Sequence, residues 1–409
     1  MVHPYSLYLH IPFCQHRCAY CDFNTYAGQA DSIPAYVDAL CHEIEFVGRH
    51  APEKFPLHTI FFGGGTPSLL TPRQFEIILA SIRANFDLLV GAEVTIEANP
   101  GTCSMVDLRE LRSVGINRLS FGVQSANREE LRMLERIHDF FDVIEAVSWA
   151  RQAGFENLNL DLIYGLPEQT LQTWQTTLKR ILALHPEHVS AYALTLEHGT
   201  PFGRWSSRGL LPIPDPDLAA EMYEWAGQAL EAAGYRQYEI SNWSKPDHEC
   251  RHNLQYWRGL PYLGLGAGAH GYANGYRYSN VLRIKTYIDR LNIEDGPKGD
   301  TGYWLPNTDF PLSPATVNHH RQSMKDDMAE MMLTGLRLTS EGIAAQAFQQ
   351  RFGCELNEVY AREIAELTHL GLLEWAQTRT SDACKASEVL RLTSRGRLLG
   401  NQVFMRFIV

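Results

Sequence analysis

The sequence predicts an α/β protein, a partial (β/α)6 barrel with added strands that is followed by a small C-terminal winged-helix-like domain. Two observations predict this fold class. As far as about Leu196, short segments rich in β-forming residues alternate with longer segments whose apolar residues recur at spacings of three and four, a pattern typical of parallel β/α units. From about Met324 onward, short helical segments lead instead to a charged loop and a strand-like segment, Val389 to Leu392.

The predicted strands and helices alternate in chain order. The strands are Leu7 to Ile11, Thr59 to Phe62, Glu93 to Glu97, Arg118 to Gly122, Leu158 to Ile163 and Val189 to Leu194. The helices between them are Ala35 to Val47, Pro72 to Asn85, Met105 to Val114, Phe140 to Gln152 and Leu171 to Leu184. Because the loops after the strand ends build the active site of a parallel barrel, the residues just past each strand are the candidates for function.

Three domains are predicted: the barrel over 1–198, a barrel extension over 199–320 and the winged-helix-like domain over 321–409. Proline and glycine are dense between Gly199 and Pro216, where the chain is predicted to leave the barrel. A helix over Leu218 to Ala233 and a strand over Tyr235 to Ile240 follow. The dipeptide Asn274-Gly275 lies between aromatic residues and predicts the two-residue turn of a β-hairpin.

Composition excludes several functional classes. The chain has 409 residues, 45% of them apolar, and a formal net charge of -11, which disfavours binding to a phosphate backbone. We therefore expect no nucleic-acid partner. The N-terminal residues lack the pattern of a signal peptide, and no apolar run reaches the roughly 18 residues that span a bilayer. The predicted location is the cytoplasm.

Cysteine spacing indicates a metal site. Cys14, Cys18 and Cys21 lie within eight positions directly after the first predicted strand. Three thiolates at these spacings can hold a 4Fe-4S cluster with one iron left open to a further ligand. On spacing alone, a zinc site completed by His10 or His16 is the alternative. The scattered cysteines are predicted to be small buried apolar residues, and these are Cys41, Cys103, Cys354 and Cys384.

Polar or glycine-rich segments follow the later strands in the same way. Gly63 to Gly65 and Thr66 follow the second strand, where consecutive glycines let the backbone approach a ligand closely. Glu97 ends the third strand, Gln124 follows the fourth and Asp161 lies in the fifth. These side chains can hydrogen-bond to hydroxyl or amino groups of a ligand, and Arg136 can pair with its carboxylate.

With its C-x3-C-x2-C motif and the aromatic Tyr20 before the third cysteine, the chain resembles the radical S-adenosylmethionine (radical SAM) superfamily. The resemblance implies a 4Fe-4S cluster held by the three cysteines and S-adenosylmethionine bound at its open iron. The wider pattern resembles the coproporphyrinogen-oxidase-like branch of that superfamily and implies a set of cofactor-binding residues. They are Tyr8, Gly64, Gly65, Thr66, Glu97, Gln124, Arg136 and Asp161.

Two families within this branch compete for the chain. Oxygen-independent coproporphyrinogen III oxidases are enzymes of porphyrin biosynthesis that typically carry a further cysteine two positions after the third, and a long segment before the first strand. Here Phe23 takes the cysteine position, and only seven residues precede Tyr8. Both differences favour the other family, although an oxidase or another radical SAM enzyme remains the alternative.

The other family is that of HemW-type haem chaperones, whose His-Asn-x-x-Tyr motif is matched by His252 to Tyr256. The resemblance implies haem as cargo, with His252 as iron ligand and Tyr256 against the macrocycle, and haem-accepting apoproteins as partners. Arg251 and Arg258 are candidates to meet the propionates. Cys250 is a competing thiolate ligand. The sequence leaves open whether an acceptor lies in the membrane and whether the chain forms a homodimer.

Overall fold

The computed structural model describes residues 4–292, 309–379 and 386–408. Within it the chain forms two compact units, each built from two segments. The first unit comprises Met1–Ala226 and Pro261–Arg321, and the second comprises Gly227–Leu260 and Gln322–Val409. The division into three domains at residues 198 and 320 remains a prediction, because these units follow a different partition.

The first unit is built around one large, mostly parallel sheet. Its central strands occur in the spatial order β1 (Tyr5–Ile11), β4 (Pro56–Gly64), β5 (Asp87–Ala98), β6 (Arg118–Gln124), β7 (Leu158–Tyr164) and β8 (His188–Ala193). Each of these strands pairs in parallel with the next. The six strands predicted from the sequence are therefore confirmed, and they stand in the predicted order.

The sheet continues on the other side of β1. There the strands are β11 (Tyr262–Leu265), β12 (His270–Ala273), β13 (Tyr276–Asn280) and β14 (Thr316–Arg321). Strand β11 is parallel to β1, and the following pairs are antiparallel. Asn274 and Gly275 both have positive φ between β12 and β13, which confirms the predicted hairpin turn. A small parallel pair, β2 (Phe13–Cys14) with β3 (Tyr26–Ala27), lies outside this sheet.

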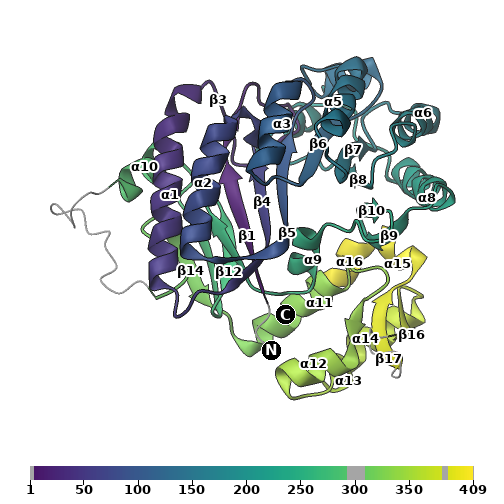
Figure 1. Cartoon of the computed structure of the whole chain (residues 1–409). Helices are drawn as coiled ribbons and strands as arrows, with labels where there is room; N and C mark the ends of the chain where they lie inside the picture. Colours follow the sequence, from purple (N-terminus) through teal and green to yellow (C-terminus); the bar gives the residue numbers. More distant parts are fainter. Residues whose placement is uncertain (1–3, 293–308, 380–385, 409) are drawn as a thin grey trace. The chain divides into compact units, whose positions relative to one another are not determined.

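Helices cover one face of the sheet, and Figure 1 shows α1, α2 and α3 side by side over the strands. The helices of this unit are α1 (Ile33–His50), α2 (Pro72–Asn85), α3 (Met105–Val114), α4 (Arg128–Met133), α5 (Phe140–Gln152), α6 (Leu171–Leu182), α7 (Pro201–Ser207) and α10 (Ile284–Leu291). A further helix, α8 (Pro216–Ala232), begins in this unit and ends in the second. The five predicted helices of the barrel are all present.

Alternation along the strands gives the sheet one apolar and one polar face. Buried apolar residues such as Leu9, Phe62 and Ile96 occupy one set of alternate positions. The other set carries buried polar residues, among them Ser6, Thr59, Thr95, Arg118, Ser120, Asn159 and Ser190. Because side chains alternate between faces, the polar set must share the face opposite the apolar one. Glu97, near the end of β5, and Asp161, in the middle of β7, belong to this polar set.

Glu43 of α1 joins the added strands to the barrel. Its fully buried carboxylate accepts hydrogen bonds from four groups of the extension. The donors are the backbone N–H of Gly266 at 2.8 Å, Asn280 Nδ2 at 2.7 Å, the Tyr287 hydroxyl at 2.7 Å and the Ser313 hydroxyl at 2.6 Å. Although burial raises the pKa of this carboxyl, all four donors favour its ionised form.

Replacement of Glu43 by Gln is expected to destabilise the first unit by about 3 kcal/mol, because an amide N–H2 would face donors that are left without an acceptor. Thermal unfolding followed by circular dichroism would measure the loss. Glu45→Gln, an exposed change on the same helix, is the matched control and should leave the midpoint unchanged. Equal midpoints for the two variants would contradict this role for Glu43.

The second unit combines a short hairpin and a helix with the C-terminal region. Strands β9 (Arg236–Glu239) and β10 (Asn242–Ser244) pair antiparallel, and α9 (Arg251–Trp257) follows them. The C-terminal elements are α11 (Met324–Gly335), β15 (Ile343–Ala344), α12 (Ala345–Phe352), α13 (Leu356–Val359), α14 (Ala361–His369), β16 (Leu373–Arg379), β17 (Ala386–Leu392), α15 (Ser394–Leu398) and α16 (Gly400–Phe404). Helices that precede a hairpin, with β15 completing a three-stranded sheet, give the predicted winged-helix-like arrangement.

Two further sequence predictions concern the scattered cysteines and membrane-spanning helices. Cys41 and Cys103 are buried as predicted, whereas Cys354 is only partly buried. Cys384 lies outside the described residues. In the part of the chain that the structure describes, no helix combines the length and apolar character that crossing a bilayer requires.

Candidate functional site

The carboxyl ends of the parallel strands surround a cavity of about 490 Å³. Its lining includes all three cysteines of the motif and seven of the eight predicted cofactor-binding residues of the barrel. These are Cys14, Cys18, Cys21, Gly64, Gly65, Thr66, Glu97, Gln124, Arg136 and Asp161. The lining residues thus come from five strands or from the loops that follow them, as expected for the active site of a parallel barrel.

The three cysteines lie on the loop that follows β1, and each is partly exposed. Cys14 ends the short strand β2, and its Sγ accepts a hydrogen bond from the Thr66 hydroxyl at 3.7 Å. Cys18 Sγ accepts one from Arg136 Nη1 at 3.5 Å. Because N–H and O–H donors stabilise negative charge on sulfur, the loop provides a favourable setting for thiolates.

Burial nevertheless favours the neutral form of two of these thiols, Cys14 and Cys21. Burial raises the pKa of Cys14, and the Thr66 hydroxyl opposes this shift. Burial also raises the pKa of Cys21, opposed by the backbone N–H of Phe23 and by the Thr25 hydroxyl. Metal binding requires the thiolates, so loading of this site releases protons.

The glycine loop after β4 is fixed to the cysteine loop by backbone hydrogen bonds. Gly65 N–H donates to the Ile11 carbonyl at 2.9 Å, and Thr66 N–H donates to the Phe13 carbonyl at 2.7 Å. A Cβ at Gly65 would lie 2.5 Å from that Phe13 oxygen, and Gly64 has a φ of +112°. Only glycine fits both positions, and the backbone there stays open to the cavity.

Two partly buried carboxylates face the cavity from β5 and β7, the strands on either side of β6. Glu97 accepts a hydrogen bond from Gly64 N–H at 2.9 Å. Asp161 accepts hydrogen bonds from Ser120 Oγ at 2.9 Å and from Asn159 Nδ2 at 2.8 Å. Burial, together with the charge of Asp161, raises the pKa of Glu97 to about 7. The Glu97 carboxyl of the ligand-free protein is therefore close to half-ionised at neutral pH.

Gln124 and Arg136 are held in specific conformations at the cavity wall. Gln124 ends β6 with a φ of +68°, a backbone region that few non-glycine residues adopt and that is concentrated at functional sites. Arg136 Nη2 donates to the Gly122 carbonyl at 2.6 Å and to the Asn99 side chain. Arg136 Nε is buried with no protein partner, so it is a donor available to a ligand.

Tyr8 and the two histidines near the motif lie differently from the other candidates. Tyr8 is absent from the described cavity lining, and its hydroxyl lies 2.9 Å from His10 Nδ1. His10 Nε2 lies 2.9 Å from the Asn24 carbonyl, so neither ring nitrogen is available to complete a zinc site. His16 Nε2 lies 3.5 Å from Glu135 Oε2. Among the described residues, no group of His, Cys, Asp and Glu side chains is arranged to hold a single metal ion.

The predicted haem motif lies on α9 in the second unit. His252 is only 1% exposed, and its Nε2 lies 2.8 Å from the Tyr256 hydroxyl, one helical turn later. The two rings are nearly perpendicular, at 85°. Cys250 precedes the helix and is also fully buried. In this conformation His252 therefore presents neither an exposed ring nor an uncovered Nε2.

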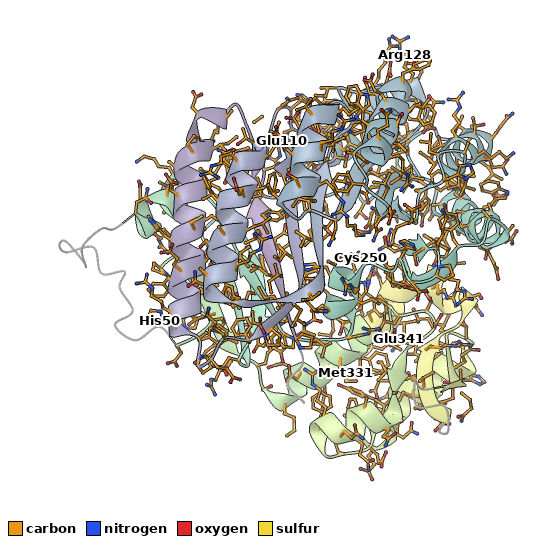
Figure 2. The ribbon with its side chains drawn as sticks, in the orientation of Figure 1. His50, Glu110, Arg128, Cys250, Met331 and Glu341 are labelled. Carbon is orange, nitrogen blue, oxygen red and sulfur yellow. The ribbon has the colours of Figure 1, made fainter. Side chains whose placement is uncertain are left out.

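The two arginines predicted to meet propionates differ in their surroundings. Arg258 is bound to Glu341 by two hydrogen bonds, Nε to Oε2 at 3.0 Å and Nη2 to Oε1 at 2.6 Å. Arg251 is exposed at the start of α9. Figure 2 labels Cys250 and Glu341 in this unit. Arg258 would have to leave Glu341 before it could bind a propionate.

Comparisons with known proteins decide the family. Residues 8–181 match the model of the radical SAM superfamily, and residues 322–381 match the HemN C-terminal domain. The chain is 37% identical to a protein named heme chaperone HemW from Bacillus subtilis, over 98% of this chain and 99% of the relative. It is 41% identical to the HemW of Mycobacterium tuberculosis strain H37Rv, over 98% and 94%. The chain belongs to the HemW family.

A solved structure agrees with this placement. Coproporphyrinogen III oxidase (HemN) from Escherichia coli, described as a radical SAM enzyme, is 25% identical and has a TM-score of 0.79, covering 99% of this chain and 90% of that one. The HemW family is thus a branch of the radical SAM superfamily, whose cofactors are a 4Fe-4S cluster and S-adenosylmethionine. Both are cofactors of this HemW-family chain.

Several cavity residues of this HemW-family protein were not predicted from the sequence. Asn99 follows β5, donates to Thr66 Oγ1 at 2.9 Å and accepts from Arg136, so it connects two of the predicted residues. Tyr192, Thr195 and Glu197 line the cavity from the end of β8 and beyond. Their positions at or just after strand ends could have indicated a role in the site, but no sequence motif distinguished them from other residues there.

Proposed function

We propose that the protein binds haem and delivers it to haem-accepting apoproteins, with a 4Fe-4S cluster and S-adenosylmethionine in the barrel. Relatives named heme chaperone HemW match the chain over nearly its whole length, and this observation carries the proposal. The His252-Asn253-x-x-Tyr256 motif on α9 supports it with one imidazole suited to axial coordination of iron. Cytoplasmic location, acceptors in a membrane and a homodimer belong to the proposal as further predictions.

In the proposed cofactor site, Cys14, Cys18 and Cys21 ligate the cluster. The residues present fit that group: three thiols share one cavity, and the glycine loop leaves backbone atoms open beside them. When bound, the cluster supplies an electron and an open iron for the amino and carboxylate groups of S-adenosylmethionine.

The chain's own residues position S-adenosylmethionine in this proposal. The buried Arg136 Nε, which has no protein partner, is assigned to its carboxylate. Glu97 and Asp161 accept hydrogen bonds from its hydroxyl and amino groups, and Gln124 contributes from the end of β6, the strand between them. Tyr8 acts through His10 rather than by contact, since it does not line the described cavity.

The raised pKa of Glu97 predicts how binding of S-adenosylmethionine depends on pH. Below about pH 7 the Glu97 carboxyl of the ligand-free protein is mostly protonated, and a cationic ligand favours its ionised form, so binding must release the proton. Affinity should therefore fall as the pH is lowered through 7, by as much as about tenfold per pH unit.

Calorimetric titration of the cluster-loaded protein at pH 6 and pH 8 would measure this effect. Glu97→Gln should bind more weakly at pH 8 and lose most of the pH dependence, whereas Glu110→Gln, an exposed change on α3, should retain it. An unchanged pH dependence in Glu97→Gln would assign the effect to another group.

The alternative function is that of a coproporphyrinogen III oxidase, which the likeness to the HemN structure favours. Phe23, at the position where such oxidases carry a further cysteine, lines the cavity and cannot supply a thiolate. With reductant and S-adenosylmethionine, the purified protein is expected not to decarboxylate coproporphyrinogen III. Chromatography of the porphyrins would detect the product, and multiple turnovers per chain would replace the chaperone proposal by the oxidase.

Delivery of haem is tested by transfer. The haem-loaded protein is mixed with a haem-free cytochrome apoprotein, and the two proteins are then separated. We expect about one haem per chain on loading and its appearance on the acceptor. Retention of all haem by the loaded protein, with every candidate acceptor, would contradict delivery.

A further inference from the structure

The predicted haem ligand is already engaged by a neighbouring side chain. His252 Nε2 and the Tyr256 hydroxyl lie 2.8 Å apart, a hydrogen-bonding distance, within one turn of α9. An imidazole coordinates iron through a nitrogen lone pair, which cannot accept a hydrogen bond at the same time. For Nε2 to coordinate iron, its proton must be on Nδ1 and the Tyr256 hydroxyl must turn away. Tyr256 thus competes with iron for the same atom.

The C-terminal end of α9 is held in place by the rest of the second unit. Arg337 lies over the Trp257 ring, with Cζ 4.5 Å from the ring centroid, and its Cζ lies 5.7 Å from the Phe404 centroid. Arg258 is paired with Glu341. These contacts act on the residues directly after Tyr256, so they limit how far its ring can move with the helix.

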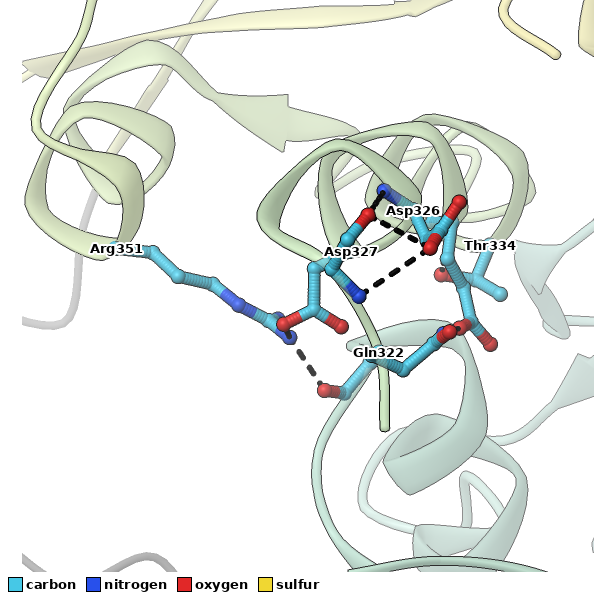
Figure 3. Close-up of polar contacts among 8 residues, drawn as sticks. Gln322, Asp326, Asp327, Thr334 and Arg351 are labelled. Atoms are coloured by element: carbon cyan, nitrogen blue, oxygen red, sulfur yellow. Dashed lines mark hydrogen bonds and ion pairs between the residues drawn. The ribbon is translucent and has the colours of Figure 1, made fainter. Parts of the chain in front are cut away.

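Arg351 adds a third contact at the same helix end. Its Nη1 donates to the Gly259 carbonyl at 3.2 Å, and its Nη2 lies 3.6 Å from Asp327 Oδ2 at the start of α11. Figure 3 shows Arg351 extended toward Asp327. Gly259, two residues after α9, has a φ of +58°, and its N–H donates to the Tyr256 carbonyl at 3.0 Å. The helix end is therefore fixed by both its own cap and the C-terminal helices.

We infer that His252 binds iron through Nε2 and that Tyr256 is a gate on this atom: the Tyr256 hydroxyl occupies Nε2 in the haem-free protein, and haem binds only after the hydroxyl is displaced. This inference rests on the proposed function, because it takes His252 as the haem ligand. It reverses the role predicted for Tyr256 from the sequence, where the ring was expected to contact the macrocycle. Because the contacts at the C-terminal end of α9 hold the helix in place, the Tyr256 hydroxyl stays on His252 Nε2 until haem iron competes for that atom.

Tyr256→Phe tests the gate, because it removes the hydroxyl and keeps the ring that packs on the helix. The variant is expected to bind haem about two- to tenfold more tightly, the range expected from losing one competing hydrogen bond, with a faster association rate. Stopped-flow absorption and equilibrium titration with haem would measure both. The absorption spectrum of the complex should match that of the wild type, since the ligand is unchanged.

The matched control is Tyr360→Phe, a change at a buried tyrosine whose ring packs against Phe348 and Phe407 in the same unit. It should leave haem affinity and association rate at the wild-type values. Unchanged or weaker haem binding by Tyr256→Phe, while His252→Ala abolishes binding, would overturn the gate and leave the proposed function intact. Wild-type binding by His252→Ala would overturn the ligand assignment and the gate together.

Discussion

Replacement of any one of Cys14, Cys18 or Cys21 by Ala is expected to remove most of the iron that the anaerobically reconstituted protein holds. The wild type should contain about four iron and four sulfide per chain, because three thiolates and one open iron are the arrangement that this motif supports. Each substitution removes one of the three bonds that anchor the cluster to the protein, and the cavity lining contains no fourth cysteine that could replace it. Iron and sulfide analysis with the visible absorption spectrum would measure the loss.

Cys41→Ala is the matched control for this experiment. Cys41 is buried in α1 and does not line the described cavity, so its removal should leave iron and sulfide at wild-type levels. A thermal unfolding curve for each variant separates loss of the cluster from loss of the fold. Stoichiometric zinc without iron–sulfur absorption in anaerobic preparations would contradict the cluster assignment, although His10 has both ring nitrogens engaged.

The helices of the barrel could be predicted closely because local chemistry marks their ends. Helices α2, α3 and α5 begin and end at the predicted residues, and each starts with a capping box. In such a box, a side chain at the cap and one three residues later satisfy backbone N–H groups that the helix leaves free. These signals are entirely local, so the sequence alone contains them.

Strand limits and long-range pairing were harder to predict. Strand β5 begins at Asp87 rather than Glu93, because its first residues are mostly exposed and carry no apolar pattern. Added strands and the hairpin turn at Asn274-Gly275 were predicted, but strands β11 and β14 and the pairing of the added strands were not. Strand β11 lies parallel to β1, about 250 positions away in sequence, and no local signal encodes such a contact. The short elements β2, β3 and α4 contain too few residues to show periodicity.

The cavity residues were predictable to the extent that motifs mark strand ends. Gly64, Gly65 and Thr66 were found because consecutive glycines are conspicuous in a sequence. The hydrogen bond from Gly64 to Glu97, and the resulting closeness of Glu97 to Asp161, depend on strand order and register. The raised pKa of Glu97 follows from that three-dimensional arrangement, so no inspection of the sequence could have supplied it.

The burial of His252 was likewise invisible in the sequence. The motif identifies an imidazole, but it does not show that the ring is 1% exposed or that Tyr256 covers Nε2. Both features arise from the packing of α9, which is followed by the left-handed Gly259, whose carbonyl accepts a hydrogen bond from Arg351. A sequence motif can name a ligand, whereas only the fold shows what must move before that ligand can bind.

His252→Ala is expected to abolish or strongly weaken stable haem binding and to leave the iron–sulfur content intact. Loss of the imidazole removes the bond to iron, which ring contacts from Tyr256 or Trp257 cannot replace. The cluster should survive, because His252 belongs to the second compact unit and all three motif cysteines belong to the first. Optical titration with haem, with iron analysis of the same samples, would measure both sites in one experiment.

Cys250→Ala decides between the two candidate ligands of α9. Cys250 is fully buried two residues before His252, and a thiolate there would give a haem spectrum different from that of an imidazole complex. We expect Cys250→Ala to bind haem like the wild type. If it loses haem while His252→Ala does not, the thiolate is the ligand. If neither change alters affinity, haem binds elsewhere, and the motif on α9 serves the packing of the second unit instead.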